Sequence, residues 1–151
     1  MEQNKLVEEL RRRAKADPRI KQEFREYGVK LDDIDLVSIT FADLDVSAKT
    51  KDCAIYLNRK LIHEKTLDEL VGYLVHELVH YAQQRTGQTA GSEARDYLDK
   101  DTEMESFKAQ VDYLRRKEGP EEALEYVLDL LDYHGLNGKK RRDKQEELLG
   151  K

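Results

Sequence analysis

Two histidines and a glutamate lie close together in this sequence, at positions His76, His80 and Glu77. Side chains four residues apart lie on one face of a helix, so the two imidazoles can bind a single tetrahedral zinc ion. Glu77 then lies beside the metal rather than on it, where its carboxylate can take a proton from a metal-bound water. The spacing therefore predicts a zinc site with hydrolytic chemistry.

The neighbouring residues favour a metal over an ordinary buried cluster. Residues 73–82, YLVHELVHYA, are uncharged apart from His76, Glu77 and His80. Burying an unpaired carboxylate with two imidazoles is costly, and a divalent cation compensates that cost directly. Two structural histidines with a hydrogen-bonded glutamate are the alternative interpretation.

This HExxH motif with uncharged flanks resembles that of the zincin metallopeptidases, and the resemblance covers about residues 53–107. A metzincin would need a third histidine six residues after His80, where this chain has Thr86. The resemblance is therefore to the gluzincins, whose third zinc ligand is a glutamate on a following helix. It implies a minimal, single-domain form of that fold.

Two glutamates, Glu103 and Glu105, can supply that ligand on a helix expected over residues 102–117. The apolar face of this helix consists of Met104, Phe107, Val111 and Leu114. Glu103 lies at the edge of that face and Glu105 on the charged side, and Ser106 matches the small residue that gluzincins carry three positions after the ligand. Glu103 is favoured, with Glu105 as the alternative. Phe107 departs from the family pattern, because it cannot accept a hydrogen bond from a ligand histidine, so that partner must come from elsewhere.

Further candidates follow from the resemblance. Gluzincins use a downstream histidine, tyrosine or arginine to stabilise the oxyanion, and the sequence offers Tyr97, Tyr113 and His134 without ranking them. If neither Glu103 nor Glu105 binds zinc, then Glu93, Asp96 and His134 are the remaining candidates for the third ligand.

The expected activity is that of a zinc metallopeptidase with one Zn²⁺ per chain, bound by His76, His80 and Glu103, and with a peptide or protein as substrate. Glu77 acts as general base toward a metal-activated water and then passes the proton to the leaving amine. The alternative is a catalytically silent, zinc-stabilised binding or regulatory module. Glu77 favours the enzyme, because a structural zinc site has no need of a carboxylate that does not bind the metal.

The sequence predicts an α+β fold, a minimal zincin-like arrangement with a small antiparallel sheet and a buried HExxH helix. Alternating apolar residues predict strands over residues 37–41 and 53–57. Residues 53–58 occupy the place of the zincin edge strand that pairs with substrate, although an interior strand is an equal alternative. Helices are expected over residues 6–14, 18–27, 67–86, 102–117 and from residue 120 onward.

Composition sets the remaining expectations. Apolar residues make up 38% and charged residues 39% of the 151 residues, which suits a single domain over residues 1–135 followed by a basic, mobile tail over 136–151. The net charge of −5 and the absence of aromatics among Lys139–Arg142 make a nucleic-acid partner unexpected. No apolar stretch resembles a signal or membrane span, so we expect a cytoplasmic protein. Cys53 is the single cysteine, which excludes an internal disulfide.

Overall fold

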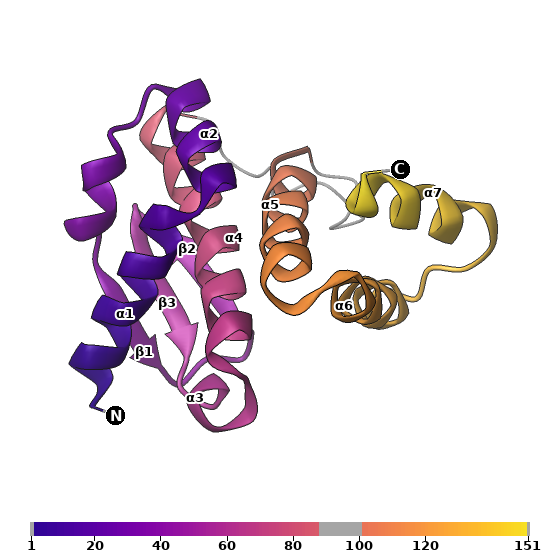
Figure 1. Cartoon of the computed structure of the whole chain (residues 1–151), viewed down its shortest axis with the longest axis horizontal. Helices are drawn as coiled ribbons and strands as arrows, with labels where there is room; N and C mark the ends of the chain where they lie inside the picture. Colours follow the sequence, from indigo (N-terminus) through magenta and orange to yellow (C-terminus); the bar gives the residue numbers. More distant parts are fainter. Residues whose placement is uncertain (1, 88–100, 151) are drawn as a thin grey trace.

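The computed structural model describes residues 2–87 and 101–150, which form an α+β fold as predicted (Figure 1). The elements are, in order, α1 (Gln3–Ala16), α2 (Pro18–Tyr27), the 3-10 helix η1 (Leu31–Asp35), β1 (Ile39–Ala42), β2 (Ala48–Lys51), β3 (Ala54–Asn58), α3 (Leu61–Glu64), α4 (Leu67–Arg85), α5 (Asp101–Glu118), α6 (Pro120–Tyr133) and α7 (Gly138–Leu149). The sheet packs with α1 and α4, and α2 packs on both of these helices. Helices α5, α6 and α7 form a second group beside α4 (Figure 1).

The sheet is mixed, which corrects the prediction of an antiparallel sheet. Its strand order is β1-β3-β2, with β1 parallel to β3 and β2 antiparallel to β3. Strand β2 was not predicted, because its residues AKTK show no apolar alternation and none of its side chains is fully buried. With β2 inserted as the hairpin partner of β3, the chain reverses twice after β1, and β3 runs parallel to it.

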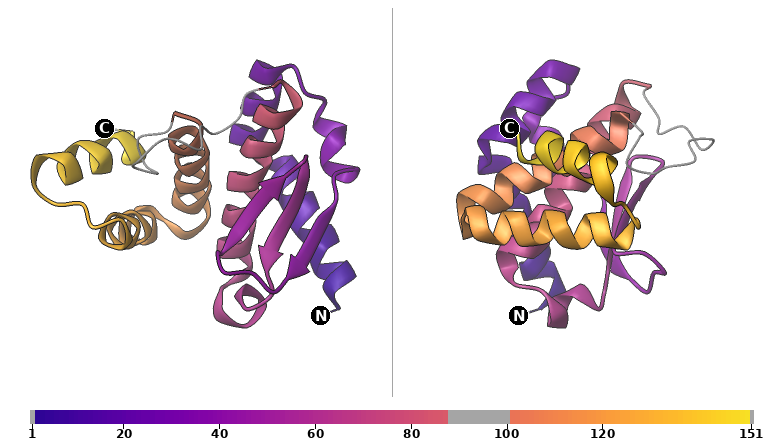
Figure 2. Two further views of the ribbon diagram at one scale, coloured as in Figure 1. Left: turned by 180° about the vertical axis from the view of Figure 1, so that it is seen from behind. Right: turned by 90° about the vertical axis from the view of Figure 1, so that its right-hand side faces the viewer.

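One face of the sheet packs against helices and forms the centre of the larger hydrophobic cluster. Ile39 pairs with Ile55 and Phe41 with Leu57, and all four side chains are buried. In the left view of Figure 2 the sheet lies in front of α4, with α1 also behind it. Helix α4 is buried along most of its 19 residues, as predicted. In the described part of the chain, no helix has the length and apolar character needed to cross a membrane.

A second hydrophobic cluster joins α5, α6 and α7. Its buried residues include Met104, Phe107 and Val111 from the predicted apolar face of α5, together with Leu131 of α6 and Leu148 of α7. Helix α5 also contributes to the first cluster and packs along α4. Helix α5 therefore connects the two clusters and carries Glu103 to the surface of α4.

The C-terminal segment differs from the predicted mobile tail over residues 136–151. Residues 138–149 form the helix α7, whose Leu148 and Leu149 are buried. Arg115 of α5 donates a hydrogen bond to the carbonyl oxygen of Leu149 at 2.7 Å. A highly charged segment with two terminal leucines looks solvated in sequence, and it folds here because α5 and α6 present apolar surface that these leucines cover.

We therefore expect Leu148→Ala to lower the free energy of unfolding by about 2–4 kcal/mol, because the leucine is 1% exposed and its truncation leaves a cavity. Leu124→Ala on α6 is the matched control, since Leu124 is 37% exposed and should cost far less. Urea denaturation at fixed zinc concentration measures both. Equal, negligible losses in the two variants would mean that α7 does not pack as described.

Candidate metal centre

Helix α4 presents the two histidines on one face. It begins with the predicted capping box, in which Glu69 N–H donates to the Thr66 hydroxyl at 3.1 Å and the Glu69 carboxylate accepts from Thr66 N–H at 3.0 Å. Gly72 faces α5, and a Cβ atom there would lie 3.4 Å from the Leu114 side chain and 3.5 Å from that of Gln110. This close contact between α4 and α5 brings Glu103 next to the histidines.

Three of the predicted site residues form one compact cluster. Glu103 Oε1 lies 2.6 Å from His80 Nε2 and 3.2 Å from His76 Nε2. One ligand atom from each of the three residues can be chosen so that all lie within 4.8 Å of one another. The side chains come from two helices and are separated by up to 27 residues in sequence, so the cluster is a product of the tertiary fold.

The remaining ring nitrogens of the histidines contact glutamine side chains. His76 Nδ1 lies 3.1 Å from Gln110 Oε1, and His80 Nδ1 lies 2.8 Å from Gln83 Oε1. With these amide oxygens as acceptors, each Nδ1 carries a proton, and each Nε2 faces the Glu103 carboxylate. The glutamines take the place of the acceptor that Phe107 cannot provide.

The sequence analysis did not find these two glutamines, although their spacing carries a signal. Gln83 lies three residues after His80, and Gln110 lies seven residues after Glu103, so each falls on the same face of its helix as the ligand. Gln83 is itself held by its amide nitrogen, which donates to the carbonyl oxygen of Thr102 at 3.0 Å. Phe107 packs its ring edge-on against His76, with ring centroids 4.5 Å apart.

The chemistry of the cluster fits a divalent cation. Both ring nitrogens of His80 face acceptor oxygens, which a neutral imidazole with one N–H cannot satisfy together. Burial opposes charge on His80, but the hydrogen bond and negative charge of Glu103 outweigh it and raise the pKa of the imidazole. Burial likewise works against the Glu103 carboxylate, and its contacts with His76 and His80 outweigh that and lower its pKa. A positive charge is needed at the point where the three side chains meet, and zinc can supply it.

Glu77 lies beside this cluster, as predicted, and does not join it. Its Oε2 atom is 4.0 Å from His76 Nε2, while its Oε1 atom accepts a hydrogen bond from the Thr50 hydroxyl at 2.9 Å. Glu77 is buried, and its bond to Thr50 holds the carboxylate near His76 Nε2. This placement suits a general base better than a ligand.

Strand β2 holds Thr50 in place through a second contact with α4. The Gln84 amide donates to the carbonyl oxygen of Thr50 at 2.8 Å and accepts from Cys53 N–H at 2.9 Å. Between these two points the chain turns through Asp52 and Cys53, both with positive φ (52° and 62°), a conformation typical of a two-residue hairpin turn and unfavourable without glycine. Gln84 thus ties the hairpin to α4 at the level of Glu77.

Of the two alternatives for residues 53–58, the interior strand is the one confirmed, and the edge strand is wrong. Residues 54–58 form β3, which is paired with β1 on one side and β2 on the other and has no free edge. The strand with a free edge next to the site is β2, because it pairs with β3 alone and carries Thr50. Strand addition by a peptide would therefore have to use β2.

Glu105 does not contact the ligand histidines in the described structure. Its carboxylate accepts hydrogen bonds from the Tyr27 hydroxyl and from Gln83 Nε2, the latter at 3.3 Å. The sequence places it on the charged face of the helix, and α2 and α4 pack against α5 on the side where it lies. Glu105 instead helps to orient Gln83, whose other amide atom contacts His80.

The two oxyanion candidates within the described residues, Tyr113 and His134, do not join the cluster. Tyr113 is fully buried, and its hydroxyl donates to Asp68 at 3.1 Å, two turns before His76. His134 caps the end of α6 and stacks edge-on with Tyr133. Tyr97 lies outside the described residues, as do the alternative ligands at positions 93 and 96. A tyrosine that the sequence analysis missed, Tyr126, does reach the site and donates to Gln110 Oε1 at 2.9 Å.

Comparisons with models of protein families, with curated protein sequences and with solved structures yield no match to this chain.

Glu103→Ala should remove the anionic ligand and abolish tight zinc binding, while Glu105→Ala should retain it. With zinc at about 100 times the wild-type Kd, bound metal contributes about 2.7 kcal/mol, and Glu103→Ala should lose this zinc-dependent rise in Tm. Glu105→Ala should keep near one zinc per chain but lose about 1–2 kcal/mol of stability, because Tyr27 and Gln83 lose their acceptor. Metal analysis and thermal melts with and without zinc separate the two. Zinc loss in the second variant alone would move the ligand role to Glu105.

Proposed function

We propose that this protein is a zinc-dependent metallopeptidase that hydrolyses peptide bonds with Glu77 as general base. The observation that carries the proposal is the buried cluster of His76, His80 and Glu103, with the Glu77 carboxylate beside the metal-facing nitrogen of His76. The donor set of two imidazoles and one carboxylate leaves a fourth tetrahedral position for water, as catalytic zinc sites require.

The chain's own residues divide the chemistry between them. Bound zinc would lower the pKa of its water and polarise the substrate carbonyl. Glu77, held by Thr50, accepts the proton of the attacking water and delivers it to the leaving amine. Gln83 and Gln110 keep both histidines in the tautomer that leaves Nε2 free for the metal.

A catalytically silent, zinc-stabilised module is the second candidate, and the burial of the site favours it. His76, Glu77 and Glu103 are each no more than 5% exposed, whereas a peptidase must admit its substrate to the metal. Glu77 favours the enzyme. Its carboxylate accepts a hydrogen bond from Thr50 and does not join the cluster, and a structural zinc site has no role for a carboxylate that does not bind the metal.

Glu77→Gln tests the general base. The amide fills the same space and can still meet Thr50, but it cannot take a proton, so peptide hydrolysis should fall by about 10²–10⁴-fold. Zinc content and Tm should stay at wild-type values. A mixture of peptides with mass-spectrometric detection of cleavage is the assay. Wild-type protein that holds one zinc and cleaves nothing, like the variant, would support the silent module instead.

Metal removal tests the site independently of turnover. A strong chelator should lower the Tm of wild-type protein, since zinc that binds only the folded state contributes its binding free energy to stability. The shift should shrink as pH falls, because protons compete with the metal for the imidazole nitrogens. His76→Ala/His80→Ala is the control, and its Tm should not respond to the chelator. An equal response in wild type and control would contradict a metal at this cluster.

A further inference from the structure

A cavity of about 200 Å³ lies between α4, α5 and α6, next to the metal cluster. Its walls carry five carboxylates, which are Glu69, Glu118, Glu122, Glu125 and Asp129. Lys65 is the one basic residue that lines it. The cavity is therefore strongly acidic, in a molecule whose surface charges are elsewhere mixed.

The negative charges of these carboxylates are not compensated by ion pairs with basic side chains of the described residues. Glu69 and Glu118 accept hydrogen bonds from the Thr66 amide and hydroxyl, at 3.0 and 2.9 Å, and these donors are neutral. No described lysine or arginine forms an ion pair with any of the three acids from α6. A cation that entered the cavity would find several charged acceptors not engaged with another cation.

The floor of the cavity also presents an unused polar group. Gln110 lines the cavity and is 1% exposed. Its oxygen accepts from Tyr126 and contacts His76, whereas its amide nitrogen has no hydrogen-bond partner among the described residues. A carbonyl oxygen of a peptide that enters the cavity can accept a hydrogen bond from this amide nitrogen.

The same cavity has apolar walls, formed by Leu114 and the rings of Tyr73 and Tyr126. An aliphatic stem with a charged end fits such a surface, because the methylene groups pack on the rings while the cation reaches the carboxylates. Lysine and arginine side chains have this construction.

The Gln110 side chain links the cavity to the cluster of His76, His80 and Glu103. Gln110 contacts both Tyr126 in the cavity and His76 in the cluster, and Tyr73 lies one helical turn before Glu77. Burial raises the pKa of Tyr126, and the nearby charges of Tyr73, Glu77 and Glu103 raise it further. A peptide whose scissile bond lies at the metal could therefore place a neighbouring side chain here.

We propose that this cavity binds a lysine or arginine side chain of the peptide substrate. The inference rests on the proposed peptidase function and adds a preference for basic residues near the cleaved bond.

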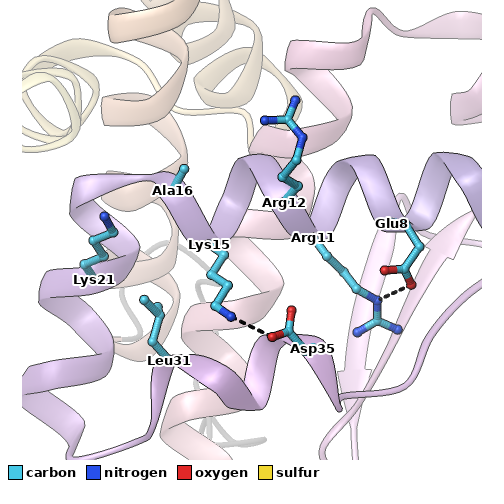
Figure 3. Close-up of a pocket in the computed structure, with 8 residues that line it drawn as sticks. All are labelled: Glu8, Arg11, Arg12, Lys15, Ala16, Lys21, Leu31 and Asp35. Atoms are coloured by element: carbon cyan, nitrogen blue, oxygen red, sulfur yellow. Dashed lines mark hydrogen bonds and ion pairs between the residues drawn. The ribbon is translucent and has the colours of Figure 1, made fainter.

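A second, larger cavity of about 400 Å³ differs from the acidic cavity, because it contains ion pairs between its own lining residues (Figure 3). It lies between α1, α2 and η1, where Lys15 pairs with Asp35 at 2.6 Å and Arg11 pairs with Glu8 at 3.3 Å. Both acids that line it are therefore paired with a basic residue of the same cavity, unlike the acids of the acidic cavity.

Binding is measured with the zinc-loaded Glu77→Gln protein, so that the probe is not consumed. The probes are fluorescein-labelled alanine-glycine octapeptides that carry a single lysine at each position in turn, with norleucine peptides as neutral controls of similar shape. At one or two positions, lysine should improve the Kd by about five-fold or more at low salt, and the gain should shrink as salt rises.

Glu125→Gln/Asp129→Asn on α6 should remove most of this gain without changing zinc content. The matched control, Glu121→Gln/Asp143→Asn, deletes two exposed carboxylates that do not line the cavity and should retain the gain. The charge-reversed variant Glu125→Lys/Asp129→Lys should prefer glutamate peptides. Because all four substituted side chains, three on α6 and Asp143 on α7, are exposed, all three variants should fold.

Two results would overturn the proposal: no preference for lysine over norleucine, or an equal loss of preference in the cavity and control variants. Spermidine that binds the cavity while lysine peptides do not would also overturn it. Failure of the peptidase function is a separate result, in which wild-type protein leaves every octapeptide intact although the cavity variants still change lysine-peptide binding.

Discussion

The structure depends on one buried electrostatic contact, in which the Glu103 carboxylate lies between the Nε2 atoms of His76 and His80. Three ionisable groups are removed from water at the α4–α5 interface. Only a positive charge at that point offsets the free-energy cost of their desolvation. The close approach of the two helices at Gly72 is what allows the contact, and the two hydrophobic clusters on either side of α5 hold it in register.

The residues around the cluster replace the usual acidic partners with amides. Gln83 and Gln110 accept from the histidines without adding negative charge, so the charge of the site comes from Glu103 and Glu77. The Glu105 carboxylate does not contact the histidines directly. It accepts hydrogen bonds from Gln83, which contacts His80, and from the Tyr27 hydroxyl. Neutral amide partners leave the imidazoles less basic than carboxylate partners would. A metal ion bound by these imidazoles would therefore keep more of its Lewis acidity.

The two groups of elements contribute different things to the site. The sheet, through Thr50 on its edge strand β2, orients Glu77 from one side, and the Gln84 contact with the strained Asp52-Cys53 turn fixes that strand against α4. The α5–α7 group supplies Glu103, Gln110 and the acidic cavity from the other side. Helix α4 carries both histidines and lies between the two groups. Because it is covered from both sides, most of its surface is apolar.

The sequence by itself determined the local part of this protein: the capped, buried helix α4 with its i, i+4 histidines, the α+β class, and Glu103 as the glutamate beside the histidines. These features depend on helical periodicity and capping, which act over a few residues. Tertiary structure decided the strand order, because the polar edge strand β2 has no apolar alternation to reveal it. It also decided the helical state of α7 and the position of Glu105, because both depend on which neighbours pack over them. Gln83, Gln110 and the acidic cavity became visible only when α4, α5 and α6 were placed together, since contacts between residues far apart in the chain leave no periodic trace in a single sequence.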